Sequence, residues 1–189
     1  MNNDFAGKQE MLKRVSAAVR DRDPDTVTAS LREILCDLIG KRQLSLPPEL
    51  LQPGEDHYGR HELHHDDELG YCVMAMSWGP GQGTPVHDHC GMWCVEGVWQ
   101  GQIEVTQYEL HEREDSHHRF ERGSTILAGP GSAGSLIPPH EYHVIRNPSN
   151  EQTAISIHIY RGELSQCNVY IPENEDGWYR RERRTLGCD

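Results

Sequence analysis

Residues 81–94 read GQGTPVHDHCGMWC, and this stretch decides the interpretation of the fold. Glycine and proline open it as a loop that leads into a predicted strand, where His87 and His89 alternate. Alternate residues of a β-strand point to one face, so we expect both imidazoles on the same side of a sheet. A third histidine from a distant strand, His143, completes a candidate metal site of three histidines.

Length and charge limit the class of protein. The chain has 189 residues, enough for one domain with a sizeable core. We expect residues 1–50 to form a helical segment that packs on a barrel of residues 51–189, as one domain overall. The 30 acidic and 18 basic residues give a net charge of -12, which argues against nucleic acid as a partner because phosphate binding needs a basic face.

Location and redox state also follow from the sequence. No apolar run approaches the ~20 residues that span a membrane, and the first residues lack the basic and apolar regions of a secretory signal. The six cysteines contain no C-x-x-C pair and are expected to be free thiols. The sequence therefore predicts a cytoplasmic protein without a membrane partner, as a monomer or small homo-oligomer.

Two helices and many short strands are predicted. Residues 9–21 and 24–40 have helical patterns, with Pro24 at a helix start and Gly40 at a helix end. From about residue 57, short apolar runs between glycines and prolines indicate a sandwich or barrel. The expected strands are 70–78, 92–99, 101–109, 124–128, 134–137, 144–147, 153–160 and 166–171. Residues 111–122 are expected to form an exposed hairpin or loop, with His117 and His118 in solvent, and residues 180–184 a surface or frayed tail.

The histidine pattern resembles the two motifs of the cupin superfamily. The positions that match the first motif are Gly81, His87, His89 and Gly101. The positions that match the second motif are Pro138, His143 and Asn147. The resemblance implies a mainly β, single-domain, jelly-roll-like barrel with α-helices at its N-terminus. Cys94 stands where the first motif commonly has a glutamate.

Loss of that glutamate has a chemical consequence. Three neutral imidazoles leave the charge of a divalent ion uncompensated, which favours an anionic ligand such as a deprotonated thiol. Imidazole ligands suit iron, zinc, copper or nickel, so the residues alone leave the metal open.

Cys94 sharpens the resemblance. Over roughly residues 55–170 the chain is similar to the cysteine dioxygenase family of thiol dioxygenases, and specifically to its arginine-type bacterial members. The family implies one Fe2+ on three histidines and O2 as cosubstrate, with a substrate that chelates the metal through thiolate and amine. Both oxygen atoms move to sulfur and give a sulfinate. The resemblance also implies a thioether between Cys94 and Tyr160.

Tyr160 belongs to a Ser-x-His-x-Tyr run that also holds Ser156 and His158. In the implied roles, the Tyr160 phenol lies over the reacting oxygen or thiolate, His158 hydrogen-bonds the phenol, and Ser156 orients the imidazole. The alternative is an ordinary strand face packed against the core.

Tyr58 and Arg60 are the expected substrate-binding residues. In the cysteine-specific branch an arginine at this place holds the substrate carboxylate by two parallel hydrogen bonds, so Arg60 favours L-cysteine. Arg161, which follows the tyrosine directly, leaves mercaptosuccinate open, and 3-mercaptopropionate is the third thiol carboxylate to consider. More distant alternatives are a metal-binding cupin of another class, such as an isomerase or sensor, and a sugar-binding or storage cupin without metal.

Overall fold

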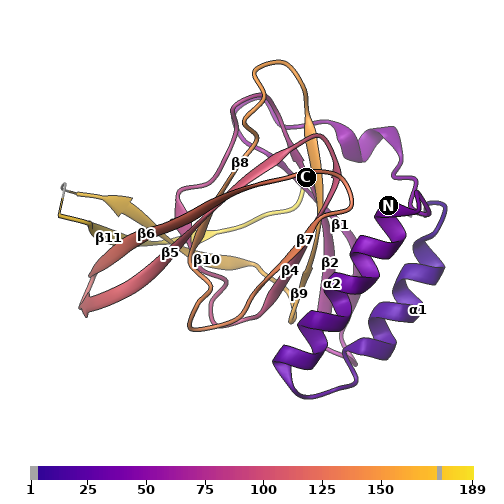
Figure 1. Ribbon diagram of the computed structural model, residues 1–189, viewed down its shortest axis with the longest axis horizontal. Helices are drawn as coiled ribbons and strands as arrows, with labels where there is room; N and C mark the ends of the chain where they lie inside the picture. The colour runs from indigo at the N-terminus through magenta and orange to yellow at the C-terminus, as the bar shows by residue number, and fades with distance from the viewer. Residues whose placement is uncertain (1–3, 174–175) are drawn as a thin grey trace.

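The computed structural model describes residues 4–173 and 176–189 of the chain. Over the described residues the chain forms two α-helices, one 3-10 helix and eleven β-strands (Figure 1). The helices are α1 (Lys8–Ala18), α2 (Pro24–Gly40) and the 3-10 helix η1 (Pro48–Leu51). The strands are β1 (Gly59–Asp66), β2 (Tyr71–Trp78), β3 (Val86–His87), β4 (Cys94–Gln100), β5 (Ile103–Glu114), β6 (His117–Ala128), β7 (Ala133–Leu136), β8 (His143–Arg146), β9 (Ala154–Tyr160), β10 (Gln166–Pro172) and β11 (Trp178–Thr185).

The strands make two groups. Five of the described strands form a sheet in the order β1-β2-β9-β4-β7, and six close on themselves in the order β10-β11-β6-β5-β8-β3. Neighbours in both groups are antiparallel. The expected class, a mainly β cupin barrel preceded by two α-helices, is confirmed.

The second helix begins where the sequence predicts. Asp23 is the N-cap residue, and its carboxylate accepts hydrogen bonds from the Thr26 backbone N–H at 3.0 Å and from the Thr26 hydroxyl at 2.6 Å. Pro24 occupies the first turn, where a missing N–H costs nothing. The helix then buries one face along its length, which fixes it on the sheet.

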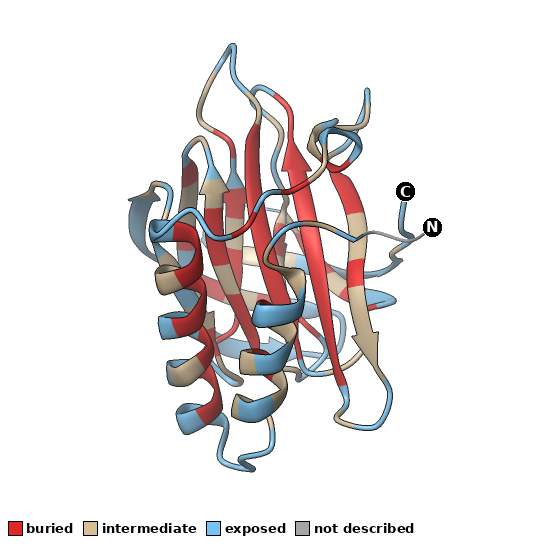
Figure 2. Ribbon diagram, turned by 90° about the vertical axis from the view of Figure 1, so that its right-hand side faces the viewer, coloured by how far each residue is buried: buried red, intermediate tan, exposed pale blue. Residues whose placement is uncertain are grey.

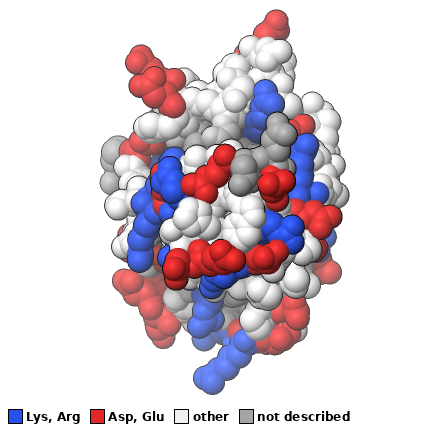
Figure 3. All heavy atoms as spheres, turned by 90° about the vertical axis from the view of Figure 1, so that its left-hand side faces the viewer, with Lys and Arg blue, Asp and Glu red and all other residues white. Residues whose placement is uncertain are grey.

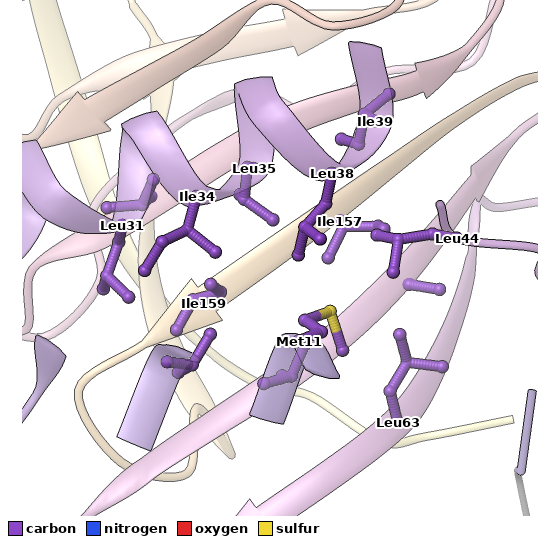
Figure 4. Close-up of a cluster of buried hydrophobic side chains, with 14 of the residues drawn as sticks. Met11, Leu31, Ile34, Leu35, Leu38, Ile39, Leu44, Leu63, Ile157 and Ile159 are labelled. Carbon is purple, nitrogen blue, oxygen red and sulfur yellow. The ribbon is translucent and has the colours of Figure 1, made fainter. Parts of the chain in front are cut away.

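Both helices cover the outer face of the five-stranded sheet (Figures 1 and 2). Leu35 and Leu38 of α2 pack with Ile157 and Ile159 of the central strand β9 (Figure 4). Gly97 of β4 permits this approach, because a Cβ there would lie 3.1 Å from the Leu35 and Ile39 methyl carbons. Side chains alternate along a strand, so the opposite face of β9 points into the barrel. Every residue of β9 is therefore buried.

Some predicted elements differ from the structure. β1 was missed because histidine, glutamate and aspartate dominate its sequence, although both faces are partly covered. Residues 111–122 form the distal part of the β5–β6 hairpin, as expected, whereas residues 180–184 lie in β11 and pair with β10 rather than fraying. His118 is fully buried rather than solvated, since its ring lies beside those of Tyr170 and Phe120.

The surface and the cysteines fit the composition. On the face that carries the ends of β5, β6 and β11, basic and acidic side chains are interspersed (Figure 3). The six cysteines are not joined by disulfides. Among the described residues, no helix combines the length and the apolar character needed to cross a membrane.

Candidate metal centre

Three histidines from two distant places in the chain converge inside the barrel. His87 ends the short strand β3, and His143 begins β8 directly opposite it in the antiparallel register. Their Nε2 atoms lie 3.1 Å apart. The ring centroid of His89 is 5.3 Å from that of His87 and 5.1 Å from that of His143. The three residues offer ligand atoms within 4.8 Å of one another.

The expected direction of the two side chains is confirmed, since the rings of His87 and His89 lie together with that of His143. The expected strand is shorter, because β3 ends at His87. A turn follows His89, where Cys90 and Gly91 adopt positive φ angles of 53° and 78°, and Cys90 is exposed.

Asp88, between the two ligand histidines, anchors this turn. The Asp88 carboxylate is buried and accepts four hydrogen bonds. They come from the backbone N–H groups of Cys90 (3.1 Å) and Asn168 (2.9 Å), the Asn168 amide (2.8 Å) and the Tyr170 hydroxyl (2.9 Å). Burial and the neighbouring carboxylate raise the pKa of Tyr170, so its hydroxyl stays a donor. Strand β10 thereby fixes the backbone between the two ligands.

The three imidazoles suit a divalent metal ion. Burial lowers the pKa of His87 and lowers those of His89 and His143 well below the usual range, so all three are neutral ligands at pH 7. Both ring nitrogens of His89 and Nδ1 of His143 are buried and have no hydrogen-bond partner among the described residues. Buried polar atoms are rarely left unpaired, and a metal ion would satisfy ring nitrogens of this kind.

A hydrogen-bonded row runs along the inner face of β9. The Trp78 indole N–H donates to the Ser156 hydroxyl at 2.9 Å, and Ser156 Oγ lies 2.7 Å from His158 Nε2. Indole only donates, so the Ser156 proton is free to go to His158 Nε2, which leaves the proton of a neutral imidazole on Nδ1. His158 Nδ1 lies 3.1 Å from the Tyr160 hydroxyl. The row therefore fixes the His158 tautomer.

Cys94 stands directly opposite Tyr160 in the register of β4 and β9. Both side chains are buried, and the Cys94 thiol donates to Glu96 Oε1 at 3.9 Å. Burial raises the pKa of the Cys94 thiol and that of the Tyr160 phenol well above their usual ranges. The two groups proposed for a thioether are thus neighbours in the protonated state.

Sequence reasoning missed one acidic residue, Glu96. It follows Cys94 by two positions on the same strand, so it shares the inward face. Its Oε1 atom lies 3.4 Å from His158 Nδ1 and 3.7 Å from His143 Nε2. A carboxylate therefore lies beside the three imidazoles, although the motif position itself is Cys94. The alternation along the predicted strand 92–99 was the signal that pointed to it.

A cavity of about 280 Å3 leads to the histidines. It is lined by His87, His158 and Tyr160, together with Tyr58 and Arg60. The Tyr58 ring stacks on Trp78, with centroids 4.3 Å apart.

Arg60 is held in this cavity by the C-terminal tail. Its guanidinium donates to the carbonyl oxygens of Gly187 (2.7 Å) and Leu164 (3.1 Å), and its backbone N–H donates to the Asp189 carboxylate (2.8 Å). Among the described residues, Arg161 is not part of the cavity lining and belongs to a surface hollow beside α1, whereas Arg184 does line the cavity.

Comparison with known proteins identifies the family. The family model for cysteine dioxygenase type I matches residues 55–172, more than half of the chain. The chain belongs to the cysteine dioxygenase type I family. Cysteine dioxygenase type 1 of Danio rerio is 26% identical over 98 residues, and that of Homo sapiens is 22% identical over 98 residues. Each match covers 52% of this chain and 48% of the relative, so the chain matches about half the length of these curated members.

Solved structures similar to this family member include two bacterial proteins. A conserved protein with a double-stranded β-helix domain from Klebsiella pneumoniae has a TM-score of 0.48 at 17% identity, over 61% of this chain and 82% of that one. A cupin superfamily protein from Desulfitobacterium hafniense has a TM-score of 0.45 at 14% identity, over 63% of this chain and 92% of that one.

Proposed function

We propose that this chain is an arginine-type thiol dioxygenase, which uses Fe2+ and O2 to convert L-cysteine to cysteine sulfinate. The reaction adds both atoms of O2 to one thiol, RSH + O2 → RSO2H, and needs no other reductant. One observation carries the proposal. Three histidines adjoin a cavity that is also lined by Tyr160, His158 and Arg60, and two of them, His89 and His143, are buried with ring nitrogens that lack a hydrogen-bond partner among the described residues.

Iron bound to His87, His89 and His143 would supply the activation of O2, which amino-acid side chains cannot provide. The protein then has to bind the thiol, orient it and control one proton. The cavity volume of about 280 Å3 accommodates a small amino acid.

Arg60 is the proposed carboxylate-binding residue. Its guanidinium has five N–H groups, and among the described residues two of them donate to backbone carbonyls, so the group keeps donors for a substrate. A carboxylate bound there is held by charge-assisted hydrogen bonds, which fix both position and orientation. Tyr58, stacked on Trp78, forms part of the wall beside it.

Tyr160 is the proposed proton donor at the reacting atoms. Because His158 Nδ1–H donates to the Tyr160 oxygen, the phenol proton is free to point to the cavity or to Cys94. Ser156 supports this by holding the His158 tautomer. A Cys94–Tyr160 thioether would fix the phenol in place, at the loss of two hydrogen atoms to an oxidant such as O2.

A second substrate is favoured by one feature. Arg184 lines the same cavity as Arg60, so a dicarboxylate such as mercaptosuccinate would find two guanidinium groups. This is the same chemistry on a different thiol.

The test is O2 uptake by the Fe2+-loaded protein with L-cysteine, 3-mercaptopropionate and mercaptosuccinate in parallel, with product masses. We expect uptake with L-cysteine and a product heavier by two oxygen atoms. The R60Q variant should weaken L-cysteine binding, whereas R161Q, outside the cavity lining, serves as the matched control. Uptake only with another thiol would overturn the substrate, and no uptake by iron-loaded protein would favour a metal-binding cupin of another class.

A further inference from the structure

We propose that a second cavity of the barrel is the route by which O2 reaches the centre, separate from the cavity that takes the thiol. It has a volume of about 200 Å3, and its lining includes Ser156 and His158 of β9. The inference rests on the proposed dioxygenase function for the identity of the gas, whereas the cavity itself is a property of the fold.

The cavity reaches the surface between the edges of the two groups of strands. β7 ends the order of the five-stranded sheet, and its Gly134 lines the cavity. In the described part of the chain, β6 pairs with β11 only at residues 117–119, which leaves residues 121–127 as an exposed edge beside β5. Ile126 of this edge also lines the cavity and is 55% exposed, so it marks the mouth.

The walls behind this mouth are apolar. Ile126 lies opposite Val105 in the register of β5 and β6, so both side chains are on the inner face. Deeper aliphatic side chains line the cavity, and all of them belong to the cluster inside the barrel: Val98, Ile103, Leu136 and Ile145. Apolar cavities of this size take up apolar guests such as xenon, and O2 is an apolar molecule of similar size.

Charge separates the two cavities. Among the described residues, no lysine or arginine lines the second cavity, and its one carboxylate is that of Glu96. The first cavity is lined by Arg60 and Arg184. An anionic thiol carboxylate is therefore attracted to the first cavity and repelled by the second, whereas uncharged O2 has no such preference and follows the apolar walls.

Both cavities end at the same side chains. His158 and Ile145 line both of them. Glu96 of the second cavity has its Oε1 atom 3.7 Å from His143 Nε2, so the inner end of this cavity adjoins the ligand histidines. A thiol carboxylate on Arg60 occupies the first cavity, whereas the second cavity stays open to the gas. The two substrates then have separate entrances to one centre.

Two substitutions narrow the second cavity from opposite walls. Gly134 lies opposite the inward-facing Glu96, and a Cβ added there meets nothing within 4 Å, so the side chain of G134L enters the cavity. I126W covers the mouth from the exposed edge of β6. The matched control is G129L, because a Cβ at Gly129 also meets nothing within 4 Å and this residue is outside the cavity lining.

The first measurement is xenon binding by the metal-free protein, located in xenon-pressurised crystals and titrated by xenon NMR. We expect xenon in the second cavity of the wild type and of G129L, and weaker binding in G134L. The second measurement is the O2 dependence of thiol oxidation by the Fe2+-loaded protein. In G134L and I126W, kcat/KM for O2 should fall at least about fivefold, with KM for the thiol unchanged.

The outcomes separate O2 entry from damage to the centre. An empty second cavity under xenon, or a wild-type kcat/KM for O2 in both variants, would overturn the inference. A rise in KM for the thiol as large as the effect on O2 would also overturn it, because the entrances would not be separate. I126W alone decides if G134L does not fold. No O2 uptake by the iron-loaded wild type would refute the dioxygenase and the O2 route with it, while xenon would still report an apolar gas site.

Discussion

Replacement of Tyr170 by phenylalanine tests whether β10 anchors the turn between the metal ligands. The Tyr170 hydroxyl is buried and donates to Asp88 Oδ2 at 2.9 Å. Phenylalanine keeps the ring and removes only this donor. A hydrogen bond to a charged group contributes about 1.5–3 kcal/mol, so Y170F should lower the free energy of unfolding by that amount. The raised pKa of Tyr170 keeps the hydroxyl protonated, so the loss should not change between pH 6 and pH 9.

Urea unfolding of the metal-free protein measures the loss. With an m-value of about 2 kcal/mol per M, the midpoint should fall by about 1 M. Y71F is the matched control, because Tyr71 is equally buried but its hydroxyl meets the neutral hydroxyl of Ser16 at 2.9 Å. A neutral pair contributes about 0.5–1.5 kcal/mol, so Y71F should cost less.

The comparison of the two variants decides the matter. A midpoint for Y170F no lower than that for Y71F would refute the role of Asp88 as a charged anchor. Y170F should also weaken metal binding, because Asp88 holds the backbone between His87 and His89, whereas Y71F should leave it unchanged.

Three further predictions concern the cavity and the thiols. S156A leaves the Trp78 indole and His158 Nε2 without their partner, so it should cost about 1–3 kcal/mol in urea unfolding and slow thiol oxidation about 10–100-fold in O2 uptake. D189A removes the Asp189 side-chain bond to the Arg60 backbone, so KM for the thiol carboxylate should rise by up to about tenfold with kcat unchanged; an unchanged KM would show that the tail does not position Arg60. Iodoacetamide at pH 8 should label the exposed Cys90 and Cys188 first, since burial raises the pKa of Cys72 to about 12 and that of Cys167 to about 11; peptide mass spectrometry after timed quenching would refute this if Cys72 reacted as fast.

Much of the architecture was predictable because it depends on local pattern. The α2 boundaries follow from Asp23, Pro24 and Gly40, and the strand β9 from an apolar run that alternates with the Ser-x-His-x-Tyr positions. The identity of the metal-site histidines depends on motif spacing, and the structure brings all three together.

The rest depended on long-range packing. The backbone between His87 and His89 is held by a hydrogen bond from Asn168 of β10 to Asp88, some 80 residues away, and no local pattern reports it. The position of Arg60 depends on the carbonyl of Gly187 at the other end of the chain. His118 is buried only because β6 packs its ring against Tyr170 of β10, although its neighbours in sequence are charged. Strand alternation predicts that Glu96 faces the same side as Cys94, but the motif comparison considered only the position of Cys94.

The sheet order gives the two parts of the site different local stability, because one part lies on the central strand β9 and the other on the two-residue strand β3. Ser156, His158 and Tyr160 lie on β9, which is hydrogen-bonded to β2 on one side and β4 on the other. Amides in the middle of a sheet exchange with solvent only on global unfolding, whereas a two-residue strand opens locally. His87 lies on such a strand, with one pair to β8 and two to β10. A metal ion that binds only the closed arrangement adds its binding free energy to that part. Hydrogen exchange of the β9 amides should therefore be slow even in the metal-free protein. Exchange of the amides around His87 should become slow only when metal is bound.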